Sequence, residues 1–348
     1  MAKSTRPPIG RSLHIGVNRL NPAEYPFKEY DGAKFKIFAC DGDERTAIDA
    51  DRYVIAWIGP LGDKELTGCE KDAKDMEQLA EKQGFRPRKL LTTQLATAEN
   101  VKAEIEAAAS ELEDGDMFLV TYAGHGLHAK DRNKDEVDDQ YDETWCLYDR
   151  MFIDDEQHAL YSTFRPGVRI LVLLDSCHSG SGTRSAPGSA PAAGNVVSRN
   201  APPEVDAFIY EYEENTRRYD AIQAGLHRGK GNVNVVSISA CQDTEEAMGD
   251  DEGGYFTGAV KRAWQSGKAQ NYVQFFELVK SELADKHPDA QQEPRMDHKI
   301  SETPLEEAIR DGKELIQAEF DAAVEASEED EEALRRLAGF LAARPLTI

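Results

Sequence analysis

Three apolar runs constrain the fold of this chain more than any other feature. They cover residues 117–123 (MFLVTYA), 168–174 (VRILVLL) and 233–240 (VNVVSISA). Each run is short, rich in branched side chains and almost without alternation, which is typical of parallel strands buried on both faces. Segments with a helical pattern lie around them, at residues 69–83, 97–112, 204–224, 254–266 and 272–286. The sequence therefore predicts an α/β fold in which a mainly parallel central sheet has helices on both faces.

Each apolar run is followed by residues that can carry chemistry. The three segments are Gly124-His125-Gly126, Asp175-Ser176-Cys177 and Cys241-Gln242-Asp243. In open α/β sheets, functional sites gather beyond the carboxyl ends of the strands. We therefore expect the site of this protein at that edge of the sheet.

Cys177 and His125 are the residues from which a catalytic pair can be built. A cysteine is nucleophilic as the thiolate, and a neighbouring histidine stabilises that form. We therefore predict that Cys177 is the nucleophile and His125 its general base. His178 is the competing base, although neighbouring side chains on an extended segment point to opposite sides. The backbone N–H groups of Gly126 and Cys177 are the expected oxyanion donors, because glycine permits a close approach of the substrate carbonyl.

Several segments together resemble the motifs of the metacaspases, within the wider caspase-like group. They are SLHIGVN (12–18), GCEKDAKDM (68–76), YAGHG (122–126), DQYDETWCLYD (139–149), IDDE (153–156), DSCHSG (175–180) and SISACQDTEEA (237–247). The separation of 52 positions from His125 to Cys177 agrees with the spacing of about 50 known for caspases, although the QACxG-type motif of caspases proper is missing. The resemblance covers roughly residues 12–300. It implies a caspase–haemoglobinase fold and cleavage of proteins after Arg or Lys.

A pocket for a basic substrate side chain needs a carboxylate. Asp175, two residues before the predicted nucleophile, is well placed for this role, and its alternative is a carboxylate that caps a loop. The family motif maps Asp72 onto a second pocket carboxylate. One position departs from the family pattern, because Ala123 stands where metacaspases commonly have Ser.

Many metacaspases require calcium, although the chemistry itself needs no cofactor. By motif position, Asp142, Asp154 and Asp155 match the calcium carboxylates of the family, and oxygen ligands are what calcium prefers. The fourth expected carboxylate falls on Arg184, whose charge would repel calcium. The sequence therefore leaves both calcium binding and its absence as alternatives.

The chain divides into four regions by composition. We expect a large-subunit-like region at 1–180, a flexible linker at 181–203, a small-subunit-like region at 204–300 that completes the sheet, and an acidic helical tail at 301–348. The linker is rich in Ser, Gly, Ala and Pro, and such segments are natural cleavage sites. Arg184 and Arg199 are the expected processing positions for activation, by the protein itself or by an upstream protease.

Charge, cysteine content and apolar segments indicate the partners and the compartment of this protein. The formal net charge of −24 argues against nucleic acid or an anionic membrane surface as partner. The five cysteines have no CxxC spacing and do not form a disulfide framework. No apolar stretch is long enough to span a bilayer, and residues 1–10 have no apolar signal region, so we expect a cytoplasmic protein. The resemblance favours a monomer.

Two other functions remain open. The first is a catalytically silent caspase-like scaffold that binds partner proteins, against which the intact Cys–His pair and the carboxylates speak. The second is a cysteine transferase or ligase on the same fold. Hydrolysis of an Arg-ending peptide would distinguish the protease from the scaffold, and an added amine nucleophile would reveal a transferase.

Overall fold

The computed structural model describes the backbone of residues 6–21, 24, 37–41, 44–48, 66–130, 141–176, 197–198, 215–226, 233–241, 247–290 and 292–300. Within these ranges, the side chains of residues 37–41, 44–48, 127–130, 141–143, 197–198, 216 and 298–300 are not described. Several predicted features lie outside the described residues. They are most of the linker, the first part of the helix expected at 204–224, and the tail at 301–348.

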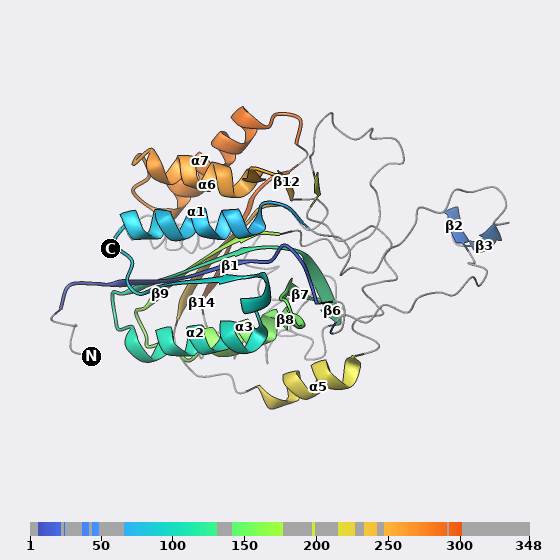
Figure 1. The fold of residues 1–348 in the computed structure, drawn as a ribbon, viewed down its shortest axis with the longest axis horizontal. Coiled ribbons are helices and arrows are strands. Elements are labelled where there is room, and N and C mark those ends of the chain that lie inside the picture. The colour runs from blue at the N-terminus through green and yellow to red at the C-terminus, as the bar shows by residue number, and fades with distance from the viewer. Residues whose placement is uncertain are drawn as a thin grey trace, which may run out of the picture.

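A six-stranded sheet forms the centre of the molecule (Figure 1). Its strands are β1 (Gly10–Gly16), β4 (Arg88–Thr92), β5 (Met117–Ala123), β9 (Arg169–Asp175), β11 (Asn234–Ser239) and β14 (Arg295–Ile300). They stand in the order β14-β11-β9-β5-β1-β4, and only the edge strand β14 is antiparallel to its neighbour. The predicted mainly parallel sheet is confirmed.

Helices cover both faces of this sheet. On one face lie α1 (Cys69–Lys82), α6 (Tyr255–Gln265) and α7 (Tyr272–Lys286), and on the other α2 (Ala98–Glu111) and α3 (Asp154–Tyr161), as Figure 1 shows. The predicted helices at 69–83, 97–112, 254–266 and 272–286 agree with α1, α2, α6 and α7 to within about one residue at each end. A fifth helix, α5 (Thr216–Gly225), also packs on the α2 side through Tyr219.

Smaller elements complete the described chain. They are β2 (Ile37–Asp41) with β3 (Glu44–Ile48); the sheet of β6 (Gly126–Lys130), β7 (Tyr141–Cys146) and β8 (Met151–Ile153); the sheet of β10 (Val197–Ser198), β12 (Met248–Asp250) and β13 (Gly253–Gly254); and the short 3₁₀ helix η3 (Thr93–Leu95). No helix among the described residues is long and apolar enough to cross a membrane.

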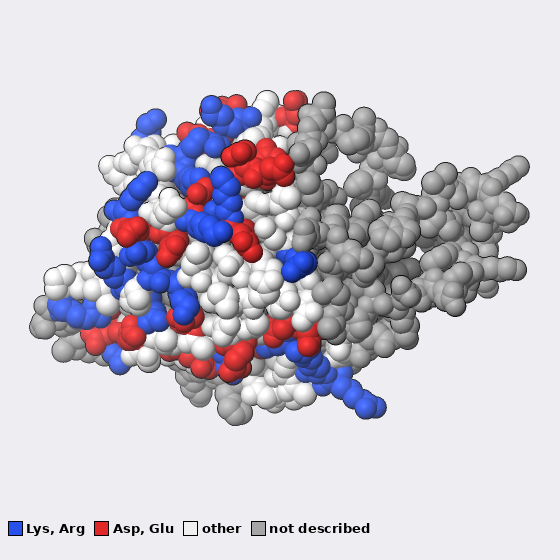
Figure 2. Space-filling model, viewed as in Figure 1, with Lys and Arg blue, Asp and Glu red and all other residues white. Residues whose placement is uncertain are grey.

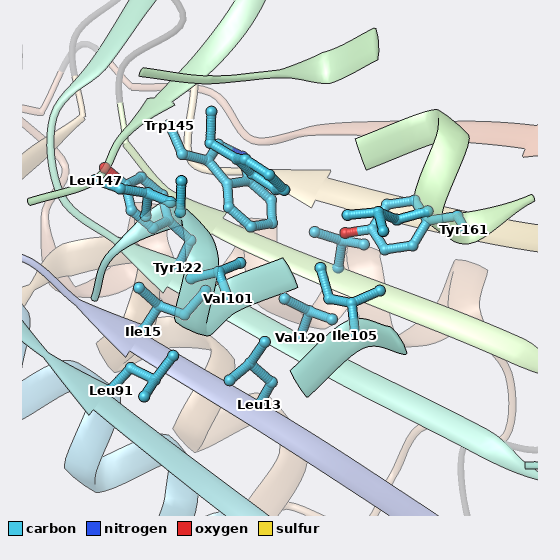
Figure 3. Packing of buried hydrophobic residues seen from close by; sticks show 14 of the residues in the cluster. Leu13, Ile15, Leu91, Val101, Ile105, Val120, Tyr122, Trp145, Leu147 and Tyr161 are labelled. Atoms are coloured by element: carbon cyan, nitrogen blue, oxygen red, sulfur yellow. The ribbon is translucent and has the colours of Figure 1, made fainter. Parts of the chain in front are cut away.

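The strands alternate their side chains between two hydrophobic cores. In β5, for example, Phe118, Val120 and Tyr122 face α2, whereas Met117 and Leu119 face α1 and α6. Figure 3 shows the α2 side, where residues of β1, β4 and β5 meet Val101 and Ile105 of α2. Burial on both faces explains why these strands appear in the sequence as nearly continuous apolar runs.

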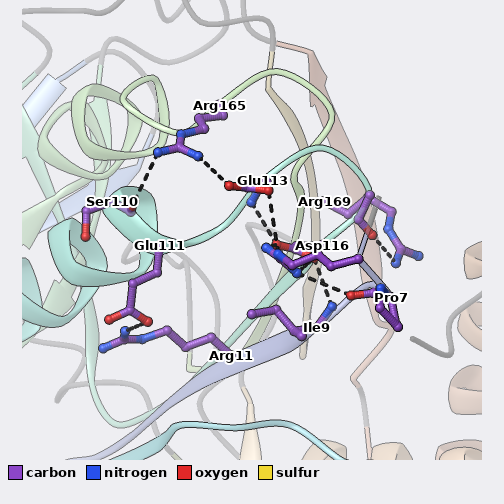
Figure 4. A network of polar contacts seen from close by, with 11 residues as sticks. Pro7, Ile9, Arg11, Ser110, Glu111, Glu113, Asp116, Arg165 and Arg169 are labelled. Atoms are coloured by element: carbon purple, nitrogen blue, oxygen red, sulfur yellow. Dashed lines mark hydrogen bonds and ion pairs between the residues drawn. The ribbon is translucent and has the colours of Figure 1, made fainter. Parts of the chain in front are cut away.

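The amino ends of the strands are held together by a buried carboxylate (Figure 4). Asp116, directly before β5, accepts hydrogen bonds from the guanidinium of Arg6 and from the backbone N–H groups of Ile9 and Glu113. Burial alone would raise the pKa of Asp116, but these hydrogen bonds outweigh it and lower the pKa. The carboxylate therefore ties the segment before β1 to β5 at the edge opposite the predicted site.

Candidate active site

The register of β5 and β9 brings the ends of these two strands, which precede the predicted catalytic residues, to the same level of the sheet. Ala123 of β5 pairs with Asp175 of β9, an offset of 52 residues that holds along the whole strand pair. The same 52 residues separate His125 from Cys177 in the sequence. His125 therefore stands two residues beyond β5, and Cys177 follows two residues after Asp175 in the chain. Cys177 itself lies just outside the described residues.

The side chain of Tyr122 fixes the backbone of His125 through a hydrogen bond. The hydroxyl of Tyr122 donates to the carbonyl of His125 at 2.6 Å and contacts that of Cys146 at 3.0 Å. The N–H of Cys146 donates to the same His125 carbonyl at 3.0 Å. The ring of Tyr122 stacks on Trp145 with centroids 5.1 Å apart (Figure 3). These contacts attach the strand end that carries His125 to β7, and the imidazole of His125 is buried.

The packing of Tyr122 requires a glycine at position 124, a reason that the sequence did not reveal. We expected the glycines around His125 to serve the approach of a substrate carbonyl. A Cβ at Gly124 would instead come within 2.5 Å of the hydroxyl oxygen of Tyr122. The absence of a side chain therefore lets Tyr122 reach the carbonyl of His125. Gly126, the expected oxyanion donor, begins β6 opposite Trp145, and its catalytic role stays a prediction.

The two predicted pocket carboxylates both meet the start of α6. Asp72 of α1 and Asp175 at the end of β9 are 3 % and 1 % exposed, so neither lies on the open surface. The N–H of Gly254 donates to both oxygens of Asp72, at 3.1 and 2.9 Å. The N–H and the hydroxyl of Thr257 donate to one oxygen of Asp175, at 2.8 and 2.6 Å. The alternative role expected for Asp175 was to cap a loop. The structure shows it capping the start of α6, a helix from another part of the chain.

A small pocket lies beside these carboxylates, between α1, α6 and the sheet. Asp72, Thr121 and Thr257 supply its polar lining, and apolar side chains such as Phe256 and Val260 supply the rest. Its volume of about 10 Å³ suits about one water molecule and is too small for an arginine side chain. A basic substrate side chain would therefore need space nearer the strand ends.

Ala123 forms an apolar cluster with Leu66 and Cys69 at the start of α1. All three side chains are buried. The position where the family commonly has Ser is therefore an apolar contact in this chain.

The predicted calcium positions lie at the open end of the β7–β8 hairpin. Position 142 is near the start of β7, and Asp154 and Asp155 begin α3 directly after β8, which is antiparallel to β7. The side chain of Asp142 lies outside the described residues. Among the side chains that are described, no group of three His, Cys, Asp or Glu could hold a metal ion.

The remaining predicted site residues lie outside the described residues. They are Cys177, His178, Arg184 and Arg199.

Sequence reasoning missed one polar group in this region. Thr257 touches Asp175, and the signal that could have found it is the Gly253-Gly254 pair that precedes a helix and allows close backbone packing. His14 of β1 is a second polar side chain of the sheet, and it is completely buried. Its two ring nitrogens lie 2.9 Å from the hydroxyl oxygens of Thr121 and Ser12. Burial, followed by the charge of Arg88, lowers the pKa of His14 to about 3, because both disfavour the charged imidazolium.

Comparison with known proteins shows the family to which this chain belongs. Residues 50–304 match the caspase domain family. The chain belongs to that family. It is 24% identical over 294 residues to Metacaspase-1 of Schizosaccharomyces pombe, covering 73% of this chain and 67% of the relative. It is 27% identical over 304 residues to Metacaspase-1A of Aspergillus fumigatus, covering 77% and 72%.

A solved structure supports the same assignment. A protein of Geobacter sulfurreducens superposes with a TM-score of 0.63 at 30% identity, over 86% of this chain and 96% of that protein. The predicted caspase–haemoglobinase fold is confirmed, and the chain is a metacaspase-like cysteine peptidase of the caspase family.

Proposed function

We propose that this metacaspase-like chain is an endopeptidase that cleaves proteins after Arg or Lys through a Cys177–His125 dyad. The observation that carries the proposal is the constant offset of 52 residues between β5 and β9, because the same offset separates His125 from Cys177. Parallel neighbours that end at one level bring the residues after them to the same edge of the sheet.

The chemistry follows from the two side chains. His125 takes the proton of Cys177, and the thiolate attacks the scissile carbonyl. The N–H groups of Gly126 and Cys177 stabilise the oxyanion, and His125 returns the proton to the departing amine. Water, activated by His125, then hydrolyses the acyl-enzyme. No cofactor takes part in these steps.

The preference for a basic residue is supported by the two buried carboxylates. Asp72 and Asp175 lie on the side of the sheet where β5 and β9 end, and both make contact with the same helix start. Carboxylates form strong charge-assisted hydrogen bonds with guanidinium and ammonium groups. Two carboxylates at this edge of the sheet would therefore suit a basic side chain of the substrate.

A panel of fluorogenic peptides tests this function. We expect hydrolysis of peptides that end in Arg or Lys and little hydrolysis of those that end in citrulline or Asp. The Cys177→Ala chain should be slower by about a thousandfold or more, because the nucleophile is gone. If the wild-type chain shows no turnover that depends on Cys177, with or without calcium and prior cleavage of the linker, the silent scaffold is the better description. An added amine nucleophile captured in the product would instead indicate a transferase.

Activation by cleavage is part of the proposal. Arg184 and Arg199 are basic residues in the Ser-, Gly- and Pro-rich segment at 181–203, and the enzyme or an upstream protease with the same preference would cut there. We expect the Arg184→Gln/Arg199→Gln chain to stay intact on a gel and to lack the gain in activity that follows processing. Cleavage within 181–203 and full activity in this variant would show that activation does not use these residues.

Asp142, Asp154 and Asp155 are the residues that would hold a calcium ion. Their placement at one end of the β7–β8 hairpin suits a hard cation, whereas Arg184 supplies no oxygen ligand. Calorimetric titration of the Cys177→Ala chain with calcium tests the site. Binding that is lost in Asp154→Asn but kept in Glu99→Gln, an exposed carboxylate on α2, supports it. Equal titrations in all three chains would exclude a calcium site at these carboxylates.

A further inference from the structure

The first turn of α6 contacts both predicted pocket carboxylates. Gly254, the residue before the helix, donates to Asp72, and Thr257, three residues later, donates to Asp175. The two aspartates come from α1 and β9, which are separate in the sequence. A single helical turn therefore sets where both carboxylates lie.

Glycine residues allow this turn to come so close. Gly253 has a φ of +125°, and a Cβ at this position would overlap an oxygen of Asp72. Gly68, directly before α1, has a φ of +90°, and its Cβ would lie 2.8 Å from the Cα of Gly253. The starts of α1 and α6 thus pack backbone against backbone, and Asp72 is enclosed between them.

Thr257 makes two hydrogen bonds to the same oxygen of Asp175. The carboxylate of an aspartate turns about a broad, two-fold torsion, so one hydrogen bond leaves its plane poorly defined. The N–H of Thr257 donates at 2.8 Å and its hydroxyl at 2.6 Å, from two directions. Together they define the plane of the carboxylate. A bidentate contact with a guanidinium depends on that plane.

We propose that Thr257 is a positioning residue, which orients the Asp175 carboxylate for the basic side chain of the substrate. The inference rests on the proposed function, because it concerns how the same pocket recognises Arg. Thr257 itself does not touch the substrate. Its backbone N–H would remain in any substitution, so the hydroxyl is the part that mutation can test.

Two substitutions at Thr257 and one elsewhere form the test. Thr257→Val keeps the shape of the side chain and removes the hydroxyl, whereas Thr257→Ser keeps the hydroxyl. Thr163→Val is the matched control, because in the described part of the chain the Thr163 hydroxyl makes a local hydrogen bond, to the carbonyl of Leu160 at 2.6 Å, after the end of α3. The substrates are two peptides that differ only in ending in Arg or in its uncharged analogue citrulline.

We expect Thr257→Val to lower kcat/KM for the Arg peptide by about tenfold, from the loss of a hydrogen bond to a charged group. The loss should fall mainly on KM, and the citrulline peptide should be affected much less. Thr257→Ser should recover most of the preference for Arg, and Thr163→Val should retain it. An unchanged ratio of Arg to citrulline in Thr257→Val would falsify the inference. A loss that Thr257→Ser does not recover would overturn it too, since that result indicates packing.

Binding of agmatine to Cys177→Ala chains separates this inference from the proposed function. Agmatine carries the guanidinium group without a scissile bond. Weaker binding in the Thr257→Val background, together with no hydrolysis by the wild-type chain, would refute the protease and keep the positioning role. Hydrolysis by the wild-type chain, together with agmatine binding that is the same with and without Thr257→Val, would support the protease and refute the positioning role. Absence of both hydrolysis and agmatine binding in the wild-type background would refute both.

Discussion

Tyr122 supports the candidate site through its hydroxyl as well as its ring. Its hydroxyl contacts two carbonyl oxygens, those of His125 and Cys146, while its ring belongs to the core on the α2 side. Tyr161, in the same core, has an equally buried hydroxyl with no hydrogen-bond partner in the described part of the structure. The two tyrosines therefore form a natural pair for comparison.

Tyr122→Phe should reduce both activity and stability. The carbonyl of His125 keeps the N–H of Cys146 but loses the hydroxyl of Tyr122, and removing such a hydrogen bond costs about 1 kcal/mol. We expect kcat to fall by about tenfold, which corresponds to a barrier raised by about the same energy. The midpoint of urea unfolding should fall as well.

Tyr161→Phe serves as the control for that experiment. It removes a buried polar group that makes no hydrogen bond, so it should be neutral or slightly stabilising. Similar losses of stability in both variants would show that the hydroxyl contacts of Tyr122 add nothing beyond packing.

The start of α6 is the element on which the pocket most depends. The β12–β13 turn and α6 reach the carboxylates only because Gly253 has no side chain. Lys71 of α1 strengthens the contact from outside, because its ammonium group donates to the carbonyl of Glu252 at 2.6 Å. Lys261 of α6 and Asp75 of α1 form an ion pair on the same side.

Gly253→Ala should destabilise the fold and weaken the preference for Arg. The substitution combines a backbone conformation that favours glycine with a steric overlap on Asp72. Strain of this kind costs about 2 kcal/mol or more. Denaturant unfolding and the ratio of Arg to citrulline hydrolysis measure the two effects.

Gly267→Ala is the control for this substitution. Gly267 also has a positive φ of +64°, but a Cβ there meets nothing within 4 Å. Only the backbone cost of about 1 kcal/mol therefore applies. Equal stability losses and an unchanged ratio in the two variants would mean that the contact with Asp72 is unimportant.

Elements were predicted from the sequence where one local signal dominates. The helix expected at 97–112 is α2, and the hydroxyl of Thr97 accepts the N–H of Asn100 at 3.3 Å. This is the capping contact that a Thr before a helix typically makes. The three apolar runs are β5, β9 and β11. The β6–β7–β8 sheet was not predicted, because its short strands have neither the length nor the periodicity that identifies the others.

The stability of the whole molecule depends more on its buried titratable groups than on its surface charges. On the face shown in Figure 2, basic and acidic side chains are interspersed over the helices. Lys102 and Glu106, for example, form a pair at 3.8 Å on the surface of α2. Exposed pairs of this kind contribute little to stability. His14 is different, because it is completely buried in the sheet and must stay neutral there.

Stability should therefore decline below about pH 6.5 because of His14. Its pKa is lowered to about 3 in the folded chain, whereas the unfolded chain binds the proton near pH 6.5. The contribution of the neutral imidazole is complete above pH 6.5 and is lost as the pH falls from there toward 3. The slope is about 1.4 kcal/mol per pH unit for one proton.

His14→Leu tests this expectation by urea unfolding between pH 8 and 5. The variant should be less stable than wild type at pH 8, because Ser12 and Thr121 lose a hydrogen-bond partner. Its stability should fall less steeply than that of wild type below pH 6.5. Parallel curves for the two chains would mean that another group governs the acid limb.

The sequence by itself determined which residues end the parallel strands and, through the spacing of the residues that follow, predicted the pairing of His125 with Cys177. These are local properties, since an apolar run and the residues that follow it are adjacent in the chain. The tertiary structure decided the order of the strands, the backbone contacts of Gly253 and the attachment of Asp72 and Asp175 to the start of α6. The hydrogen bonds among these contacts join residues up to 182 positions apart. They depend on how two helices pack on one sheet, and no pattern within a single segment encodes that distance.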